Sequence, residues 1–486
     1  MQVTSEVQVQ NTALEQQAID VVIMAAGKGT RMKSRLPKVL QPLAGRPLLR
    51  HVLDTAQALH ARQAVVITGH GAIEVEAACA MDTRATAEFS INFVRQEPQL
   101  GTGHAVQQAV PALADDGLVL VLSGDVPLTA PATLQRLLAA SAGSQLALLT
   151  LEMADPSGYG RIVRSGAGAV QAIVEQKDAT PEQRAINEIY SGILAVPARQ
   201  LKRWLARLDN KNAQGEFYLT DIVKFAVADG VSVVTHKIDD PVQVAGVNSP
   251  VQLAQLERAY QLQQAHRLME NGVRLADPAR IDVRGDLQCA HDVSIDVNCV
   301  FEGQVSLGEG VSIGANCVIA NAVIEGGAVI HPFTHIDGEK LGVTVGAGSL
   351  IGPFARLRPG ARLGADVHIG NFVEVKNSTL ANGAKANHLA YLGDATVGER
   401  VNFGAGSITA NYDGANKHRT TIEADVHVGS NCVLVAPITL GAGGTVGGGS
   451  TLTKDTPAGA LSVARGKQVS IANWSRPAKV PKDPAA

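Results

Sequence analysis

Several segments of the chain carry residue types that bind phosphates or move protons. Residues 24–32 (MAAGKGTRM) follow an apolar run and contain a Gly-x-Gly turn, whose exposed backbone N–H groups can hold phosphate oxygens. Such a turn alone is equally compatible with an ordinary connection between a strand and a helix. Arg31 and Lys38 raise its specificity, because they place two cations beside the glycine turn, where a triphosphate would lie.

Asp125 and His388 are the two candidates for further chemistry. Asp125 directly follows the apolar residues 118–122, and a carboxylate at the carboxyl end of a central strand lies where ligands bind in α/β sheets. Asp is also common in simple turns. His388 lies in residues 386–394 (ANHLAYLGD), which interrupt the regular pattern of the second half of the chain. A lone histidine in such a segment is more often structural than catalytic.

The first half of the chain alternates apolar runs with amphipathic stretches. Residues 21–24, 64–67 and 118–122 predict buried strands, and residues 47–59 and 132–140 predict helices between or after them. This alternation predicts an α/β domain with a Rossmann-like, mostly parallel sheet. We place it at residues 20–249, after an N-terminal extension at residues 1–19, and we expect residues 250–270 to form one connecting helix.

The second half has a period of six residues, which suits neither a helix nor a plain strand. It predicts a left-handed parallel β-helix, built of coils of three short strands that each point one aliphatic side chain inward. We assign residues 271–486 to this domain and its tail. Breaks in the period, at residues 321–350 and 377–396, are expected to be loops extruded from the coil. The periodic residues are Leu307, Ile313 and Ile319, then Ile351, Leu357, Leu363, Ile369 and Val375, then Ile422, Val428, Leu434, Leu440, Val446 and Leu452.

The composition agrees with two domains and a small-molecule enzyme. A chain of 486 residues is too long for one core, and a net charge of −3 gives no reason to expect nucleic acid or an anionic membrane as a partner. Only 3% of the residues are aromatic, whereas 31 of the 49 glycines lie from Gly272 onward, as suits a solenoid. Five widely spaced cysteines, a polar start without a signal peptide and the lack of a long apolar stretch predict a cytoplasmic protein without an integral membrane segment.

Further motifs recur in the order found in one known family. Residues 27–38 resemble the signature of sugar-1-phosphate nucleotidyltransferases, and residues 99–105 (QLGTGHA) resemble their base-recognition loop. Residues 158–162, 174–179, 214–221 and 246–248 narrow the resemblance to the bifunctional N-acetylglucosamine-1-phosphate uridyltransferase/glucosamine-1-phosphate acetyltransferase family, the GlmU family. In the second half, the segments around Glu374, His388, Asn402 and Asn411 match its acetyltransferase. The resemblance runs from about residue 21 to about residue 465.

The resemblance implies an enzyme that makes UDP-N-acetylglucosamine, a precursor of peptidoglycan and lipopolysaccharide, from UTP and N-acetylglucosamine 1-phosphate. It implies Mg²⁺ held by Asp125 and Asn248, with Lys38 and Arg31 offsetting phosphate charge. It also places the following residues at the nucleotide and sugar: Met24, Ala25, Ala26, Gly27, Arg31, Lys38, Gln96, Gly101, Thr102, Ser123, Gly124, Asp125, Gly160, Glu175, Tyr190 and Asn248.

For the second half, the resemblance implies acetyl transfer from acetyl-CoA to glucosamine 1-phosphate, with His388 as the general base. The sugar phosphate would be bound by Arg358, Lys376, Tyr391 and Asn402, and acetyl-CoA by Ala405, Asn411, Tyr412, Ser430, Gly448 and Arg465. Lys417 would lie in the same cleft, whereas His331, His335 and His427 are expected at surface or corner positions. The family also implies a homotrimer in which three β-helices pack together.

Two residues depart from the family pattern, which usually has Asn at the position of Tyr190 and Ala at the position of Gly448. A lost methyl group at Gly448 should matter little. For Tyr190, one interpretation places the phenol against the amino sugar and weakens sugar binding by about 1 kcal/mol, the net worth of one hydrogen bond. The other places the ring inside the fold, so that a neighbour such as Ser191 or Glu175 makes the contact. We favour the first.

Three other functions are less consistent with the sequence. A sugar nucleotidyltransferase that makes ADP-glucose or GDP-mannose often lacks the segments around His388 and Asn411. A non-catalytic assembly subunit would have no reason to keep Lys38, Asp125, Asn248 and His388 together. An ice-binding or adhesive β-helix would show threonine ladders or a secretion signal.

Overall fold

The structure is a computed structural model that describes residues 17–80 and 89–478. The chain divides into two compact units, Met1–Gln264 and Ala265–Ala486, and the dividing point lies within helix α9 (Pro250–Glu270). Most of the predicted N-terminal extension, residues 1–16, lies outside the described residues, as do residues 479–486 of the predicted tail. Among the described residues, no helix is both long and apolar enough to cross a membrane.

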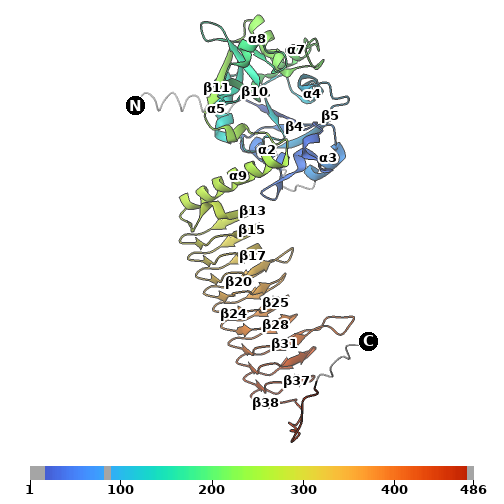
Figure 1. The fold of residues 1–486 in the computed structure, drawn as a ribbon, viewed down its shortest axis with the longest axis vertical. Helices are drawn as coiled ribbons and strands as arrows, with labels where there is room; N and C mark the ends of the chain where they lie inside the picture. The colour runs from blue at the N-terminus through green and yellow to red at the C-terminus, as the bar shows by residue number, and fades with distance from the viewer. Residues whose placement is uncertain (1–16, 81–88, 479–486) are drawn as a thin grey trace, which may run out of the picture. The chain divides into compact units, whose positions relative to one another are not determined.

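The first unit is built on a mixed sheet of nine strands within the described residues (Figure 1). Strand β1 (Ile19–Met24) lies at its centre, between β4 (Gln63–Thr68) and β6 (Leu118–Ser123), and pairs with both in parallel. The predicted Rossmann-like, mostly parallel sheet is therefore confirmed. The remaining strands are β5 (Ser90–Arg95), β7 (Leu146–Glu152), β8 (Gly160–Arg164), β9 (Val170–Val174), β10 (Glu188–Pro197), which is antiparallel to β6 and β7, and β11 (Val233–Ile238).

Both faces of this sheet are covered by other elements. Successive residues of the central strand β1 point to opposite faces, and those from Val21 to Ile23 are all apolar and buried. Val21 and Ile23 belong to one hydrophobic cluster and Val22 to another, as the alternation of side chains along a strand requires. The first cluster also takes side chains from α2 (Leu48–Ala58) and α5 (Pro131–Ser141). The second takes them from α4 (Thr102–Ala109), α7 (Ala198–Leu205) and α8 (Ile222–Ala228).

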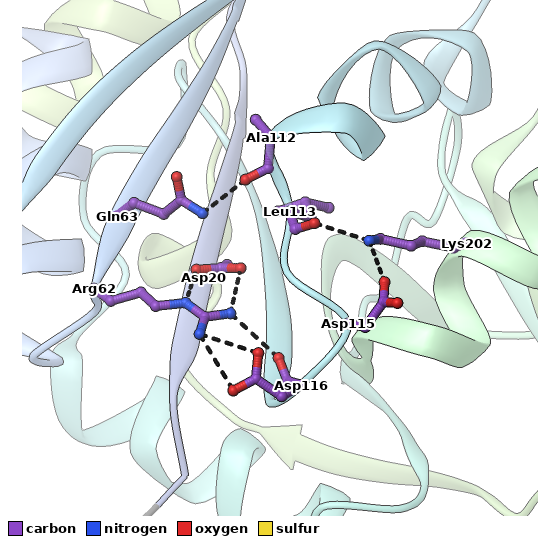
Figure 2. Close-up of polar contacts among 8 residues, drawn as sticks. All are labelled: Asp20, Arg62, Gln63, Ala112, Leu113, Asp115, Asp116 and Lys202. Carbon is purple, nitrogen blue, oxygen red and sulfur yellow. Dashed lines mark hydrogen bonds and ion pairs between the residues drawn. The ribbon is translucent and has the colours of Figure 1, made fainter.

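An ion-pair network holds the amino ends of the central strands together (Figure 2). The Asp20 carboxylate is fully buried and accepts hydrogen bonds from Arg62 Nε at 2.6 Å and from Arg62 Nη2 at 2.9 Å. Arg62 Nη1 also donates to Asp116 Oδ1 at 3.2 Å, while Lys202 Nζ donates to the Leu113 carbonyl at 2.8 Å. A buried charge needs such a partner, so the network links β1, β4 and the turn before β6.

The second unit is the predicted left-handed parallel β-helix, whose short strands stack coil upon coil (Figure 1). The strands named in its two long sheets pair in parallel, and Ile295 lies beside Ile313, its counterpart in the next coil. All the periodic aliphatic residues named from the sequence are buried. One end of the core is covered by Ala265 and Leu268 of α9, whereas after the last strand, β38 (Leu461–Ser462), residues 463–478 are exposed.

The expectation of extruded loops at the two breaks in the period is wrong for residues 377–396. There the coil continues, and Leu363 pairs with Leu380 and Val375 with Leu392, so that each coil is one residue shorter than the coil from Ile295 to Ile313. A missing corner residue shifts the phase without opening the coil. At residues 321–350 the coil also continues, with a short insertion between β19 (His335–Asp337) and β20 (Val343–Val345).

The longest insertion that the structure describes in the β-helix lies elsewhere, between β31 (Ile408–Ala410) and β32 (Thr420–Ile422). Ala395 pairs with Thr420, which lies beyond this insertion in the next coil. Residues 411–419 therefore leave the coil as a loop next to β31 (Figure 1).

Candidate functional site

The glycine turn after β1 is held in one conformation by its contacts with neighbouring segments. The Ala25 N–H donates to the Ile67 carbonyl at 2.9 Å, and the Gly124 N–H donates to the Met24 carbonyl at 2.9 Å. Gly29 adopts a φ of 57°, and a Cβ there would lie 2.8 Å from Lys38 Cβ. Glycine is therefore needed at this position, both for its backbone and for the close approach of Lys38. Arg31 is exposed and does not line the cleft.

A cleft of about 370 Å³ opens at the carboxyl ends of β1 and β6, where ligands bind in such sheets. Ten of the residues predicted from the sequence line it: Met24, Ala25, Ala26, Gly27, Lys38, Gln96, Gly101, Thr102, Ser123 and Asp125. Four lining residues were not predicted: Val39, Gln99, Ala105 and Glu216. Gln99 and Glu216 lie within motifs that the sequence analysis singled out, so the motifs themselves were the available signal.

The predicted base-recognition loop is pinned to a distant segment of the chain. The Gly103 N–H donates to the Phe217 carbonyl at 2.7 Å, and the Leu219 N–H donates to Thr102 Oγ1 at 3.1 Å. A Cβ at Gly101 would lie 2.6 Å from the Phe217 oxygen, so only glycine fits there. Gln96 Nε2 donates to the Gly101 carbonyl at 2.9 Å and thereby fixes the start of the loop.

Lys38, Asp125 and Asn248 meet at one edge of the cleft. Lys38 Nζ donates to Asp125 Oδ2 at 2.6 Å and to Asn248 Oδ1 at 3.2 Å. The Val247 N–H donates to the Asp125 carbonyl at 3.0 Å, which brings Asn248 beside the carboxylate. One carboxylate and one amide oxygen are the hard ligands that Mg²⁺ takes when substrate phosphates complete its shell, and they already hold a cation, the ammonium. The pair therefore fits Mg²⁺.

The residues predicted to meet the amino sugar form a separate group beside β8 and β9. Glu175 accepts a hydrogen bond from Thr220 Oγ1 at 2.9 Å, and burial raises the pKa of its carboxyl. A Cβ built on Gly160 would lie 3.8 Å from both Glu175 carboxylate oxygens. None of the predicted sugar residues Gly160, Glu175 and Tyr190 lines the 370 Å³ cleft.

Tyr190 is only 7% exposed and belongs to the core cluster that contains Ile162 and Ile173. Its hydroxyl is buried and has no hydrogen-bond partner among the described residues. Burial, and then the nearby Glu175 charge, raise its pKa. This position favours the second of the two interpretations of Tyr190, in which the ring is part of the fold.

In the second unit, His388 is oriented by the neighbouring coil. Strands β24 (His368–Asn371) and β27 (Lys385–His388) pair so that Asn371 lies beside His388, and His388 Nδ1 is 2.8 Å from Asn371 Oδ1. An amide oxygen can only accept a hydrogen bond, so Nδ1 carries a proton, and in the neutral imidazole Nε2 then keeps a free lone pair. This is the arrangement of a general base. Asn371 was not predicted, although it lies one coil before His388.

A second cleft, of about 450 Å³, opens beside His388. Four predicted residues line it: His388, Asn402, Ala405 and Ser430. His427, for which we expected only a surface or corner position, also lines it from β33 (His427–Val428), and its Nδ1 lies 3.2 Å from Asn402 Nδ2. The predicted residues Arg358, Lys376, Tyr391, Asn411, Tyr412, Gly448 and Arg465 do not line this cleft.

Arg358 and Lys376 on neighbouring coils and Lys417 on the loop 411–419 bring positive charge together. The charge of Arg358, followed by burial and by Lys417, lowers the pKa of the Lys376 ammonium. Arg358 Nη1 donates to Glu374 Oε1 at 2.7 Å, which fixes the guanidinium. Neighbouring cations of this kind are suited to a phosphate dianion.

The predicted acetyl-CoA residues that do not line this cleft lie on the loop 411–419, in the last coils and just after β38. Asp413 accepts hydrogen bonds from the Ala415 and Asn416 N–H groups, at 2.8 and 2.6 Å, and these bonds hold the pKa of its carboxyl well below the usual range. Arg465 Nη1 donates to the Gly448 carbonyl at 2.8 Å. A Cβ at Gly448 would lie 3.4 Å from the Ser430 carbonyl oxygen, an ordinary contact.

Comparisons with known proteins agree on both units. A family model described as a MobA-like NTP transferase domain matches residues 21–211. A model of the bacterial transferase hexapeptide matches residues 342–377, and one of the hexapeptide repeat of succinyl-transferase matches residues 419–454.

Two full-length relatives are both described as a bifunctional protein GlmU. The one from Albidiferax ferrireducens is 77% identical over 465 residues, which are 95% of this chain and 100% of the relative. The one from Polaromonas naphthalenivorans is 78% identical over 466 residues, which are 95% of this chain and 98% of the relative. A solved structure of UDP-glucose pyrophosphorylase with UDP-glucose is 18% identical, with a TM-score of 0.42, and the match covers 50% of this chain and 98% of that one.

Proposed function

The chain belongs to the GlmU family of bifunctional enzymes, and from this membership we propose which residues carry each of its two reactions. The protein is a bifunctional transferase of UDP-N-acetylglucosamine synthesis, with a nucleotidyltransferase unit and a hexapeptide acetyltransferase unit. The observation that carries the assignment is the presence of two clefts of different chemistry. One, in the first unit, has a glycine turn and a lysine, and the other, in the second unit, has an oriented histidine.

Acetyl transfer comes first in this proposal. His388 Nε2 takes a proton from the amine of glucosamine 1-phosphate while the amine nitrogen attacks the acetyl carbonyl of acetyl-CoA. The carbon–sulfur bond breaks, the proton taken up by His388 passes to the sulfur so that coenzyme A leaves as its thiol, and the amide of N-acetylglucosamine 1-phosphate is formed. The Asn371 side-chain oxygen Oδ1 keeps a proton on Nδ1, so the base stays in the productive tautomer. Arg358, Lys376 and Lys417 bind the sugar phosphate, and Tyr391 and Asn402 bind the sugar.

Uridylyl transfer follows in the first unit. An oxygen of the sugar phosphate attacks the α-phosphorus of UTP, and pyrophosphate leaves without a covalent enzyme intermediate. The backbone of residues 24–27 holds the nucleotide, Gln96, Gly101 and Thr102 bind the uracil, and Lys38 offsets negative charge on the phosphates. We propose Mg²⁺ at Asp125 and Asn248, where it would supply further neutralisation of phosphate charge.

The direct test is incubation of the protein with glucosamine 1-phosphate, acetyl-CoA, UTP and Mg²⁺, with free thiol and pyrophosphate followed in time. Thiol should appear first, and pyrophosphate should follow with a lag that disappears when N-acetylglucosamine 1-phosphate is supplied. Pyrophosphate release that never depends on acetyl-CoA, starting from glucosamine 1-phosphate, would contradict the proposed order.

We also propose a homotrimer and a cytoplasmic location. Four predicted acetyl-CoA residues, Asn411, Tyr412, Gly448 and Arg465, do not line the cleft beside His388. They would contact the cofactor if a second copy of the chain completed the binding cleft, and this supports the trimer. Light scattering should give three copies for the whole chain and for a fragment that begins at Asn271, but one copy for a fragment that ends at Ala265. The cytoplasm is supported by the five cysteines, none of which forms a disulfide within the described residues, and by the need for UTP and acetyl-CoA.

A further inference from the structure

The contact of Lys38 with Asp125 and Asn248 has a consequence for how a metal ion enters the first unit. The ammonium contacts one oxygen of each residue, at 2.6 and 3.2 Å, and the Lys38 and Asp125 side chains are only 14% and 17% exposed. Asp125 and Asn248 are the two residues that the proposed function assigns to Mg²⁺, and the ammonium contacts one of the two Asp125 carboxylate oxygens and the Asn248 amide oxygen. The residue proposed to bind phosphates and the residues proposed to bind the metal are thus joined to one another.

We propose that Lys38 is a place-holding cation, which competes with the divalent metal for the oxygens of Asp125 and Asn248 until nucleotide phosphates draw its ammonium away. This inference rests on the proposed uridylyl transfer and adds to it a coupling between two ligands. Metal binding and nucleotide binding should each strengthen the other, because either one favours the same displaced position of Lys38.

Competition follows from the geometry of the contact. A magnesium ion bonds oxygen ligands at about 2.0–2.1 Å and demands near-octahedral directions, so it needs the lone pairs that the ammonium now uses. Two cations beside one carboxylate also repel each other, and this repulsion is weakly screened where both side chains are mostly buried. The metal and the ammonium therefore compete for this pair of residues.

The lysine side chain is suited to leave without a change in the fold. Its backbone begins the short helix η2 (Lys38–Leu40), which follows Pro37, and the Leu40 N–H donates to the Pro37 carbonyl at 2.9 Å. Four methylene groups connect this fixed backbone to Nζ, so rotation about side-chain bonds can carry the ammonium toward the glycine turn at residues 24–27. Lys38 and the glycine turn at residues 24–27 line the same cleft. The phosphates would thus offer Lys38 new anionic partners.

The test measures metal binding to the full chain, with Mn²⁺ as the probe and the free Mn²⁺ signal in electron paramagnetic resonance as the readout. Without nucleotide, Lys38→Met should bind Mn²⁺ about tenfold more tightly than the unaltered protein, a coupling of ordinary size. Lys38→Arg, which keeps a cation, should not gain affinity. The double variant Lys38→Met/Asp125→Asn should lose the gain and show that it arises at this pair. Melting temperatures test whether each variant is folded. If Lys38→Met does not fold, Lys38→Gln replaces it in the measurement.

A second measurement separates this inference from the function on which it rests. With UTP and no sugar phosphate, which prevents turnover, UTP should tighten Mn²⁺ binding more for the unaltered protein than for Lys38→Met. Equal affinities of the two proteins without nucleotide would overturn the place-holding role, even where Asp125→Asn weakens binding with UTP present. An Asp125→Asn variant with unchanged Mn²⁺ affinity in both conditions would instead remove the proposed metal site.

Discussion

The two units position their reactive side chains by different means. In the first unit, Asp125 and Asn248 are far from Lys38 in sequence, and the three come together from the start of η2, the turn after β6 and the segment before α9. In the second unit, Asn371 and His388 meet because they occupy the same position in successive coils. In a β-helix, neighbours in space can be found by adding the coil length, whereas in the α/β unit the sheet order must be known first.

The sharpest way to test this separation is to remove His388, the proposed base of the second unit. His388→Ala should lower acetyl transfer by about 10²–10⁴-fold, because it removes the imidazole that Asn371 orients beside that cleft. Pyrophosphate release from N-acetylglucosamine 1-phosphate should not change. Asn371→Ala serves as the matched variant and should lower the acetyl transfer rate less, since it only releases the ring orientation. Loss of both activities in a folded His388→Ala protein would contradict two independent sites.

The corresponding change in the first unit is Asp125→Asn. Removal of the charged ligand proposed for Mg²⁺ should lower uridylyl transfer by about 10²–10³-fold, as loss of other single electrostatic contacts does. Asp125 remains partly exposed and its amide variant keeps the shape, so the melting temperature should move little. Thiol release in the second unit is the internal control. Near-normal uridylyl transfer at saturating Mg²⁺ would exclude Asp125 as a metal ligand.

Stability can separate the units as well as activity. Asp20→Ala leaves Arg62 and the amino ends of β1 and β4 without their buried anion, and we expect it to lower the free energy of unfolding of the first unit by about 2 kcal/mol. This is below the cost for a fully buried pair, because Arg62 is one-third exposed. Urea unfolding followed by Trp204 fluorescence, from the core of the first unit, would measure it, and acetyl transfer should survive. Asp116→Ala, at the exposed side of the same network, should cost under about 1 kcal/mol.

The smallest effect is expected at Tyr190. Tyr190→Phe removes a buried hydroxyl without a described partner, so stability should stay level or rise by up to about 1 kcal/mol. Tyr190→Asn should lower the melting temperature, because it empties part of the core around Ile173. Both variants should keep the KM for N-acetylglucosamine 1-phosphate if the ring is part of the fold. A lower KM for Tyr190→Asn at unchanged stability would instead support the interpretation in which Tyr190 faces the sugar.

Periodic apolar residues predicted both folds, because residues that face a buried core are apolar and recur at the spacing of the secondary structure. The inward residues from Leu307 to Leu452 and the strands ending at Met24 and Ser123 are where the pattern placed them. The same pattern misjudged residues 377–396, since a coil that loses one corner residue changes phase as abruptly as a loop does.

Less of the candidate site than of the fold could be predicted from the sequence. Lys38 and Asp125 were chosen from their residue types and positions and Asn248 from the resemblance to the family, but nothing in their spacing reveals that the three meet. Asn371 was within reach, because it precedes His388 by nearly the coil length that the period predicts. His427 was not, since the loop 411–419 lies between it and Asn402 and lengthens that coil. For Tyr190, the alignment with the family gave the correct position in the chain but did not reveal the direction in which the larger side chain points.

The unequal ends of the β-helix imply a gradient of motion along it. Its core is closed by α9 at one end, while beyond β38 the chain is exposed and adds no further buried coil. Each coil is hydrogen-bonded only to its neighbours, so local opening should spread inward from the open end and amide hydrogen exchange should slow step by step toward Ile295. Gly448 and Arg465 belong to the fast-exchanging end. A cofactor that binds there would therefore slow exchange most in the last coils, and the enzyme would lose part of its binding free energy in ordering them.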